Sequence, residues 1–397
     1  MLFLLLIALF LCYVDRVLIS IAGIEIQREF GWSDSEKGLV FSSFFIGYLI
    51  MQLLGGILAN KFGGDRVLLA AVLVWSLATL FTPAATYIGF FVLIAARVVL
   101  GLGEGLATPS GFNLIRQRMQ SNEVSFSIAL MNSASAVGTI FALLTVGLMI
   151  SLWGWPSVFY LFGTAGIVWC ILWFMSETDC PDQSIEISNR PPIPYRAIMF
   201  HPAVLPLYFV SITASSISFM LASWLPSYYV DTYEVDLVQA GTYSIAPWVA
   251  IAVTTATSGY LADRWIAHGH NRLKVRKTLL TFGLSFAAIG CLAITVVSDV
   301  RIAIVTIGLI FGGLGFAIPG YVPVANELFP DHGEVLFGFF AASGSFFSAI
   351  AVAVTGILLD VTGSYSSVFV GLAICSAIGV VVFNMFASVT PIAINQK

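Results

Sequence analysis

Four ionisable residues stand within otherwise apolar runs of this 397-residue chain. Asp15 and Arg16 are adjacent in the first run, whereas Arg97 and Glu104 are seven residues apart in a later one, a spacing that puts both on one face of a helix. A charge at the centre of a bilayer costs at least about 2.5–3.5 kcal/mol, so such residues are candidates for function. An arginine fork matches the oxygens of a carboxylate or a phosphate. We therefore predict that Arg16 is the main ligand of an anion.

The two acids have a different predicted task. A carboxyl group against apolar walls holds a proton more readily, and a nearby cation opposes this effect. We expect Asp15 and Glu104 to exchange protons during a transport cycle, with Glu104 also switching its pairing to Arg97. The alternative is a structural network of two acids and two bases that only neutralises itself, although apolar packing can replace such a network. Tyr13 and Tyr48 either donate hydrogen bonds to the anion or simply pack.

The amino-acid composition indicates that the chain is embedded in lipid. Hydrophobic residues make up 59% of the chain and charged residues 10%, with a mean hydropathy of +0.96. Soluble domains have about 25% charged residues, so the excess apolar surface is expected to face lipid. Nucleic-acid binding has no support. The five cysteines lack metal-ligand or disulfide-framework spacing, and we predict neither a metal nor a cofactor.

Apolar runs of about 20 residues can each cross a bilayer as a helix. No small-residue cleavage site precedes Asp15, so the first run is predicted to be a spanning helix rather than a signal peptide. Odd-numbered loops hold only Arg28, Lys37 and Arg301, whereas even-numbered loops are rich in Lys and Arg, which predicts that both termini lie on the cytosolic side or its equivalent. The twelve predicted runs are 2–24, 38–60, 66–85, 89–111, 123–150, 156–176, 203–230, 237–262, 274–297, 300–327, 334–359 and 366–388.

Short motifs recur in the same order about 200 residues apart. Residues 55–66 (GGILANKFGGDR) are echoed by 258–264 (SGYLADR), and Ser157-Val-Phe159 by Ser367-Val-Phe369. A parallel repeat of six spans is typical of the major facilitator superfamily, in which the substrate lies near the midplane between the halves. We predict an all-α membrane protein of twelve helices, with six-helix bundles at 1–176 and 203–397 and a proline-containing cytoplasmic linker at 177–202.

Two further motifs are assigned structural or gating roles. Gly101, Gly103 and Gly105, followed by Pro109, predict a fourth span that is bent and packs closely, or slides, against its neighbours. Glu327 is placed at the membrane boundary. The charged and polar residues of the repeated loop motif are predicted to form cytoplasmic gate contacts; they are Asn60, Lys61, Asp65, Arg66, Asp263 and Arg264.

Several stretches resemble the anion:cation symporter family of this superfamily. They are 13–20 (YVDRVLIS), 42–48 (SSFFIGY), 97–105 (RVVLGLGEG), 154–160 (GWPSVFY), 223–229 (SWLPSYY) and 275–277 (VRK). The resemblance implies that Arg16 and Arg97 contact or position the anion, that Asp15 and Glu104 serve coupling, and that Tyr13 and Tyr48 line the site.

Three positions depart from the pattern of that family. The stretch 326–330 (NELFP) replaces an Asn-His-Gln-Asp-like sequence, and Asn60 stands where aspartate is common. The stretch 341–343 (AAS) lacks a frequent asparagine, and Ser343 is the polar residue there that is assigned to the substrate.

The sequence thus predicts a monomeric alternating-access transporter in a lipid bilayer. It moves a small anion, inorganic phosphate or an organic carboxylate, together with protons or sodium. A transporter of the same fold for a neutral or cationic solute is the nearest alternative, and a membrane receptor also stays open. An enzyme is disfavoured, because the spans contain no arrangement of nucleophile and base.

Overall fold

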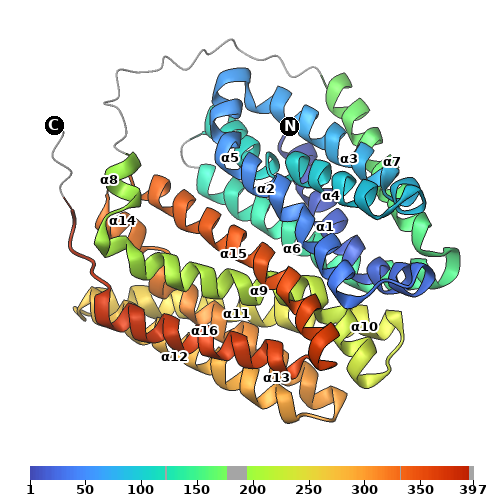
Figure 1. The fold of residues 1–397 in the computed structure, drawn as a ribbon. Coiled ribbons are helices and arrows are strands. Elements are labelled where there is room, and N and C mark those ends of the chain that lie inside the picture. The colour runs from blue at the N-terminus through green and yellow to red at the C-terminus, as the bar shows by residue number, and fades with distance from the viewer. Residues whose placement is uncertain (121–122, 177–194, 331, 393–397) are drawn as a thin grey trace. The chain divides into compact units, whose positions relative to one another are not determined.

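The computed structural model describes residues 1–120, 123–176, 195–330 and 332–392, and these residues form helices without strands (Figure 1). Most of the predicted linker, 177–194, lies outside the described residues. The helices are α1 (Leu2–Phe30), α2 (Asp34–Phe62), α3 (Gly64–Ile88), α4 (Phe90–Glu104), α5 (Ala107–Arg118), α6 (Val124–Trp153), α7 (Trp155–Met175), α8 (Tyr195–Met199), α9 (Leu205–Tyr233), α10 (Leu237–Tyr243), α11 (Ala246–Ala267), α12 (Arg272–Ala293), α13 (Val300–Tyr321), α14 (Val324–Leu328), α15 (Gly333–Thr362) and α16 (Ser366–Phe386).

Among the described residues, twelve helices or pairs of consecutive helices are long and apolar enough to cross a membrane, as predicted. Several extend beyond the predicted runs, because polar residues continue a helix past its apolar part. The first reaches Phe30, and the second begins at Asp34. A capping box fixes this second start: the Ser33 hydroxyl accepts from the backbone N–H of Glu36, whose carboxylate accepts from the Ser33 N–H.

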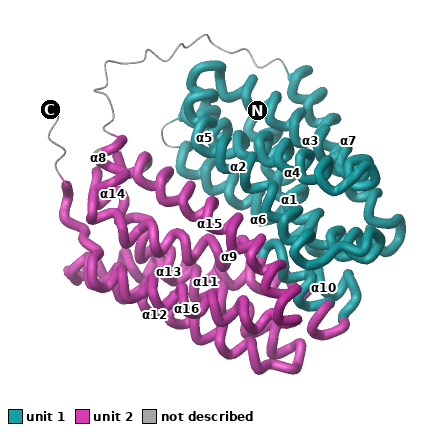
Figure 2. The backbone as a smooth tube through the Cα atoms, in the orientation of Figure 1, with its two compact units in different colours: residues 1–190, 222–230, 235–242 teal, residues 191–221, 231–234, 243–397 magenta. Residues whose placement is uncertain are grey.

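The chain forms two compact units (Figure 2). The first unit contains residues 1–190, 222–230 and 235–242, and the second contains 191–221, 231–234 and 243–397. The first unit therefore includes most of the C-terminal half of α9 and nearly all of α10. Because this division follows packing rather than chain order, the predicted domain boundaries remain a prediction.

Hydrogen bonds within the first unit bring alternate loops to the same end. The carboxylate of Glu29, near the end of α1, accepts from Nε1 of Trp155 at 2.6 Å and from the hydroxyl of Tyr87 at 3.0 Å. At the other end, Asn113 of α5 donates to Asn60 at 2.7 Å and accepts from the backbone N–H of Gly64 at 3.1 Å. The first, third and fifth loops thus lie at one end of this unit, and the second and fourth at the other.

The second unit follows the same alternation. At one end, Tyr365 donates to Asp231 at 2.8 Å and Tyr233 donates to the carbonyl of Val297 at 2.9 Å. At the other end, Lys277 donates to the carbonyl of Asn384 at 2.7 Å. The packing also repeats. The second span packs on the fourth, the third on the fourth and the third on the sixth among the first six spans, as do their counterparts among the last six.

A glycine seam brings α2 against α4. A Cβ atom built on Gly47 would lie 2.0 Å from the carbonyl oxygen of Val98, and one on Gly101 would lie 2.1 Å from that of Phe44. Only glycines allow this approach. The α4 helix ends at Glu104 and α5 begins at Ala107, so the predicted bend is confirmed. Pro109 explains the break, because a proline ring clashes with the carbonyl four residues earlier.

Candidate functional site

Arg16 of α1 is the centre of a charged and aromatic cluster in the first unit. Its Nε and Nη2 atoms lie 3.0 and 2.9 Å from Oε2 of Glu104. The guanidinium carbon lies 4.6 Å from the ring centroid of Tyr13, 4.9 Å from that of Tyr48 and 5.3 Å from that of Phe44. Arginine stacks favourably on aromatic faces. The Arg16 side chain retains 18% exposure, whereas that of Glu104 has none.

Local structure explains this geometry. One turn of α1 separates Tyr13 from Arg16, and one turn of α2 separates Phe44 from Tyr48, whose rings stack at 5.4 Å. The glycine seam holds α2 close to α4, so the two rings from α2 and the carboxylate from α4 reach the same guanidinium. The structure therefore brings together Tyr13, Arg16, Tyr48 and Glu104, as predicted from the sequence.

Arg97 and Asp15 are buried beside this cluster. Within the described residues Arg97 has no ion pair, and its guanidinium carbon lies 5.4 Å from the Phe44 ring. Three buried atoms, Nε of Arg97, Oδ1 of Asp15 and Oε1 of Glu104, lack a hydrogen-bond partner among the described residues. The charges of Asp15 and Glu104 both act on Arg97. The four residues thus form one electrostatic group with unused donors and acceptors.

One pairing differs from the sequence interpretation. The seven-residue spacing puts Arg97 and Glu104 on one helix face, and Glu104 was predicted to pair with Arg97 during the cycle, but in the structure Glu104 pairs with Arg16. Two side chains on one helix face need not form a pair. Here Arg16, from the neighbouring helix α1, occupies the carboxylate of Glu104. The predicted switch of Glu104 to Arg97 would be a second arrangement and remains a proposal.

The sequence analysis missed three polar residues of α3. Nε1 of Trp75, Oγ of Ser76 and Oγ1 of Thr79 are buried and have no hydrogen-bond partner among the residues that the structure describes. Thr79 lies close enough to Asp15 to act on its carboxylate. Ser and Thr in apolar helices usually bond a carbonyl of the preceding turn, as Thr82 does. Nothing in the sequence distinguishes Thr79 from such a residue.

Comparison with known proteins settles the family. Residues 5–275 match the family model described as Major Facilitator Superfamily. The chain belongs to this superfamily. A solved structure of a D-xylose-proton symporter shares the fold, with a TM-score of 0.75 at 15% identity over 98% of this chain and 97% of the other.

Curated relatives place the chain in the anion:cation symporter branch of the superfamily, as its motifs predicted. A probable anion transporter 4 of rice chloroplasts is 34% identical over 95% of this chain and 66% of its own length. An Arabidopsis chloroplast ascorbate transporter is 33% identical over 95% and 72%, and an Arabidopsis sodium-dependent phosphate transport protein 1 of chloroplasts is 32% identical over 96% and 77%. This chain therefore spans about two thirds to three quarters of these relatives. They are transporters rather than enzymes.

The predicted gate residues of this superfamily member lie at helix ends. In the first unit, Asn60, Lys61 and Arg66 are exposed and Asp65 is buried in the first turn of α3. Asn113, which the sequence analysis did not single out, ties Asn60 to the start of α3. In the second unit, Asp263 and Arg264 are exposed at the end of α11. Their gating role remains a prediction.

The second unit contains a buried ion pair that the sequence analysis did not anticipate. Nε and Nη2 of Arg276, in the first turns of α12, donate to Oε1 of Glu327 at 3.2 and 2.9 Å, and Nη1 donates to the carbonyl of Pro319 at 2.8 Å. Glu327 had been placed at the membrane boundary, and no partner had been predicted for Arg276. Ser343 of α15 donates to the carbonyl of Phe340 at 2.7 Å, and its contact with substrate remains a prediction.

Proposed function

We propose that this superfamily member is a secondary active transporter of a small anion, inorganic phosphate or an organic carboxylate. The observation that carries the proposal is the partly exposed guanidinium of Arg16 within its aromatic cluster. Aromatic faces hold the guanidinium plane, and the exposed part offers donors in the fork that carboxylate and phosphate oxygens match.

Charge balance supports an anion as the substrate. Arg16 is neutralised by Glu104, whereas Arg97 has no ion pair within the described residues. With Asp15 and Glu104 both charged, the four residues sum to zero, and protonation of either acid leaves one positive charge that a bound anion compensates. A cation would add to that positive charge. The names of the three plant relatives refer to an unspecified anion, ascorbate and phosphate, which agrees with this charge preference.

Coupling follows from competition for Arg16. Glu104 and the anion both need its donors, so protonation of Glu104, or a sodium ion beside it, releases the guanidinium to the substrate. Asp15, buried near Arg97 and Thr79, is the second group proposed to exchange the coupling ion. We propose a monomer with both termini on the side of the basic loops, and gate contacts by the helix-end residues named above.

Transport in liposomes tests the proposal. The purified protein is reconstituted, and uptake of labelled phosphate and of labelled carboxylates is measured under separately imposed proton and sodium gradients. Arg16→Gln should reduce uptake about 100-fold, because losing one partner of a buried charge pair costs about 2–5 kcal/mol. Arg16→Lys, which keeps the charge but loses the fork, should retain an intermediate rate.

Arg28→Gln is the matched control. Arg28 lies on the same helix, but its side chain is 59% exposed and pairs with Glu25 outside the cluster. Uptake by this variant should equal that of the unchanged protein. No uptake of any anion under either gradient, or unchanged uptake of a neutral or cationic solute in Arg16→Gln, would overturn the proposal.

A further inference from the structure

Lys37 is a lysine in the first turn of α2 with only 1% of its surface exposed. The sequence analysis placed it in a loop; the structure corrects this, because α2 begins at Asp34. Its Nζ donates to Oε1 of Gln27 at 2.6 Å and lies 3.4 Å from Oδ1 of Asp34. The same atom lies 4.8 Å from the ring centroid of Trp224. A buried ammonium loses hydration that these contacts must replace.

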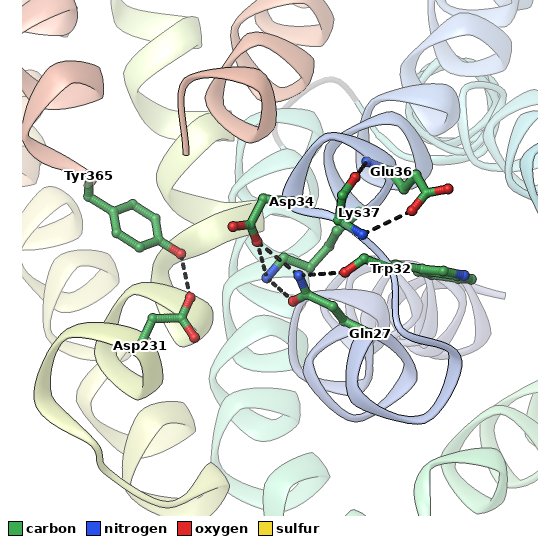
Figure 3. A network of polar contacts seen from close by, with 8 residues as sticks. Gln27, Trp32, Asp34, Glu36, Lys37, Asp231 and Tyr365 are labelled. Carbon is green, nitrogen blue, oxygen red and sulfur yellow. Dashed lines mark hydrogen bonds and ion pairs between the residues drawn. The ribbon is translucent and has the colours of Figure 1, made fainter. Parts of the chain in front are cut away.

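The amide of Gln27 is oriented by two other bonds (Figure 3). Its Nε2 donates to Oδ1 of Asp34 at 2.9 Å and to the carbonyl of Trp32 at 3.2 Å. These bonds direct Oε1 toward Lys37. The end of α1, the α1–α2 turn and the start of α2 thus hold the ammonium in one place, against the face of Trp224.

Phe41 lies one turn along α2 from Lys37. Its ring meets the Trp224 ring edge to face at 5.4 Å, and both residues are buried. The same ring covers α1 at Gly23, where an added Cβ atom would lie 2.8 Å from Cε1 of Phe41. Trp224 comes from α9 but belongs to the first unit. Phe41 therefore fills the space between α1, α2 and this part of α9.

The contacts between α1 and α2 occur at three levels. Arg16 meets Phe44 and Tyr48 at the first level, Gly23 meets Phe41 at the second, and Gln27 meets Lys37 at the third. The third level adjoins the turn that joins the two helices. The aromatic pair of Phe41 and Trp224 consequently lies between the arginine site and the end of the unit that carries the α1–α2 turn.

Helix α10 packs tightly on the first unit as well. A Cβ atom on Gly147 would lie 2.5 Å from the carbonyl oxygen of Leu237, and one on Gly241 would lie 2.3 Å from that of Leu143. Segments 222–230 and 235–242, from the second half of the chain, are thus seated directly on helices of the first half. In alternating-access transporters one half moves against the other, so contacts between segments of the two halves are candidates for a gate.

We propose that Phe41 and Trp224 form a gate between the arginine site and the α1–α2 turn, and that the buried ammonium of Lys37 sets how readily this gate opens. The transport role of the gate rests on the proposed function. Closing the gate removes water from Lys37, and opening it returns that water. Lys37 therefore favours opening, relative to an apolar residue of the same shape.

The direction in which an apolar substitution of Lys37 changes gate opening distinguishes two roles. Lys37 either favours opening of the gate or only holds α1 and α2 together through hydrogen bonds. Removing one partner of an ion pair is destabilising when the other partner stays buried and charged, but the side chain of Asp34 is 30% exposed and keeps its bond from Nε2 of Gln27. Methionine has nearly the length of lysine and packs well on aromatic rings. Lys37→Met should therefore stabilise the closed arrangement, whereas an anchor made of hydrogen bonds would be weakened by the same change.

Cysteine labelling measures the gate without a substrate. Ser20 lies on α1 between Arg16 and Gly23 and is buried. Ser20→Cys is introduced into a protein whose own cysteines are replaced by serine. The protein is reconstituted in liposomes, and a membrane-impermeant thiol reagent is applied from the side of the α1–α2 turn. Lys37→Met should slow labelling about tenfold, which corresponds to about 1.4 kcal/mol. Trp224→Leu should accelerate it.

Lys274→Met is the control, because Lys274 is an exposed lysine in the first turn of α12. It should leave labelling unchanged. Equal or faster labelling in Lys37→Met, at an unchanged melting temperature, would overturn the role of Lys37. Unchanged labelling in Trp224→Leu would show that the aromatic pair is not the barrier. If labelling responds as expected while no anion is transported, the gate stands and the proposed function fails.

Discussion

The two units share a packing scheme but use polar residues differently. In the first unit, Arg16, Arg97 and Glu104 lie within spans beside aromatic rings, and two of their buried atoms, Nε of Arg97 and Oε1 of Glu104, have no hydrogen-bond partner among the described residues. In the second unit, the Arg276 guanidinium lies near helix ends and bonds through Nε, Nη1 and Nη2, and the atom of this ion pair that lacks a partner among the described residues is Oε2 of Glu327.

This contrast indicates a division of tasks. Buried polar groups are normally bonded to protein, to ordered water or to a ligand, so the unbonded atoms of the first unit mark where water, an ion or a substrate could bind. A fully bonded arginine that ties two helix ends serves the fold instead. The common packing scheme is therefore a scaffold, and the asymmetry lies in the polar groups that each unit places on it.

The glycine seams test the scaffold, and their substitution should have the largest effect. Gly101→Ala places a Cβ atom 2.1 Å from the backbone oxygen of Phe44, which cannot move away alone. We expect a loss of about 3 kcal/mol of stability or of the folded protein altogether. Gly315 of α13 makes the corresponding close approach to α11 in the second unit, and Gly315→Ala should cost less, about 1–2 kcal/mol. Its nearest contact is the Thr254 hydroxyl, which can rotate, and the nearest backbone atom, the Ile251 oxygen, lies at 2.9 Å.

Gly308→Ala is the control for both variants, because a Cβ atom there has nothing within 4 Å. Its melting temperature in detergent should match that of the unchanged protein or exceed it, as alanine favours a helix. Equal melting temperatures for the Gly101 and Gly315 variants would show that rotation of the Thr254 side chain does not reduce the steric clash. The two glycine contacts would then be equally strict.

The two buried arginines test the division of tasks directly. Arg276→Met leaves the Glu327 carboxylate without its partner and should lower stability by about 3 kcal/mol. The double variant Arg276→Met with Glu327→Leu should regain most of that loss. Arg97→Met removes an arginine that has no ion pair within the described residues, so stability should fall by less than in Arg276→Met.

Transport should respond in the opposite order. If Arg97 compensates the charge of the anion, Arg97→Met should reduce uptake about 100-fold, by the same cost of an uncompensated buried charge. Melting temperature and liposome uptake, measured on the same preparations, distinguish a transport role of Arg97 from a structural one. A large loss of stability in Arg97→Met would make this arginine structural, and the contrast between the units would disappear.

Much of the fold was predictable from the sequence. The long apolar runs predict the number of spans, and the alternation of basic and non-basic loops predicts their direction. The break after Glu104 was predictable from Gly105 and Pro109. The start of α2 was not predicted correctly, although Ser33 and Glu36 have capping-box spacing. The apolar residues begin at position 38, and the predicted span was defined by apolar residues alone. That error concealed the burial of Lys37.

The side-chain pairings were less predictable, because they depend on contacts far apart in the chain. Arg16 and Glu104 are 88 residues apart, and Arg276 and Glu327 are 51 apart. Spacing along one helix suggested the pair of Arg97 and Glu104 instead. Which acid meets which arginine depends on how closely α2 approaches α4, a property that the glycines suggest but do not quantify.

Substitution of Glu104 in the first unit and of Glu327 in the second should have the smallest effects on transport and stability. The two variants compare the units directly. Glu104→Gln keeps the shape of the side chain but holds Arg16 with a neutral group, so the anion no longer competes with a carboxylate. Accumulation driven by an ion gradient should fall about tenfold, a loss of about 1.4 kcal/mol, because Asp15 remains as a second group that can exchange the coupling ion. Exchange of labelled for unlabelled anion at equal concentrations should persist, because exchange needs no net movement of the coupling ion.

Glu327→Gln should reverse this pattern. Its carboxylate bonds Arg276 at a helix end of the second unit, so its neutralisation should lower the melting temperature while the ratio of gradient-driven accumulation to exchange stays unchanged. The ratio is the decisive quantity, because a variant that merely folds poorly lowers both rates together. Retained gradient-driven accumulation in Glu104→Gln would remove this acid from coupling and leave Asp15 as the group to test. A changed ratio in Glu327→Gln would extend coupling to the second unit.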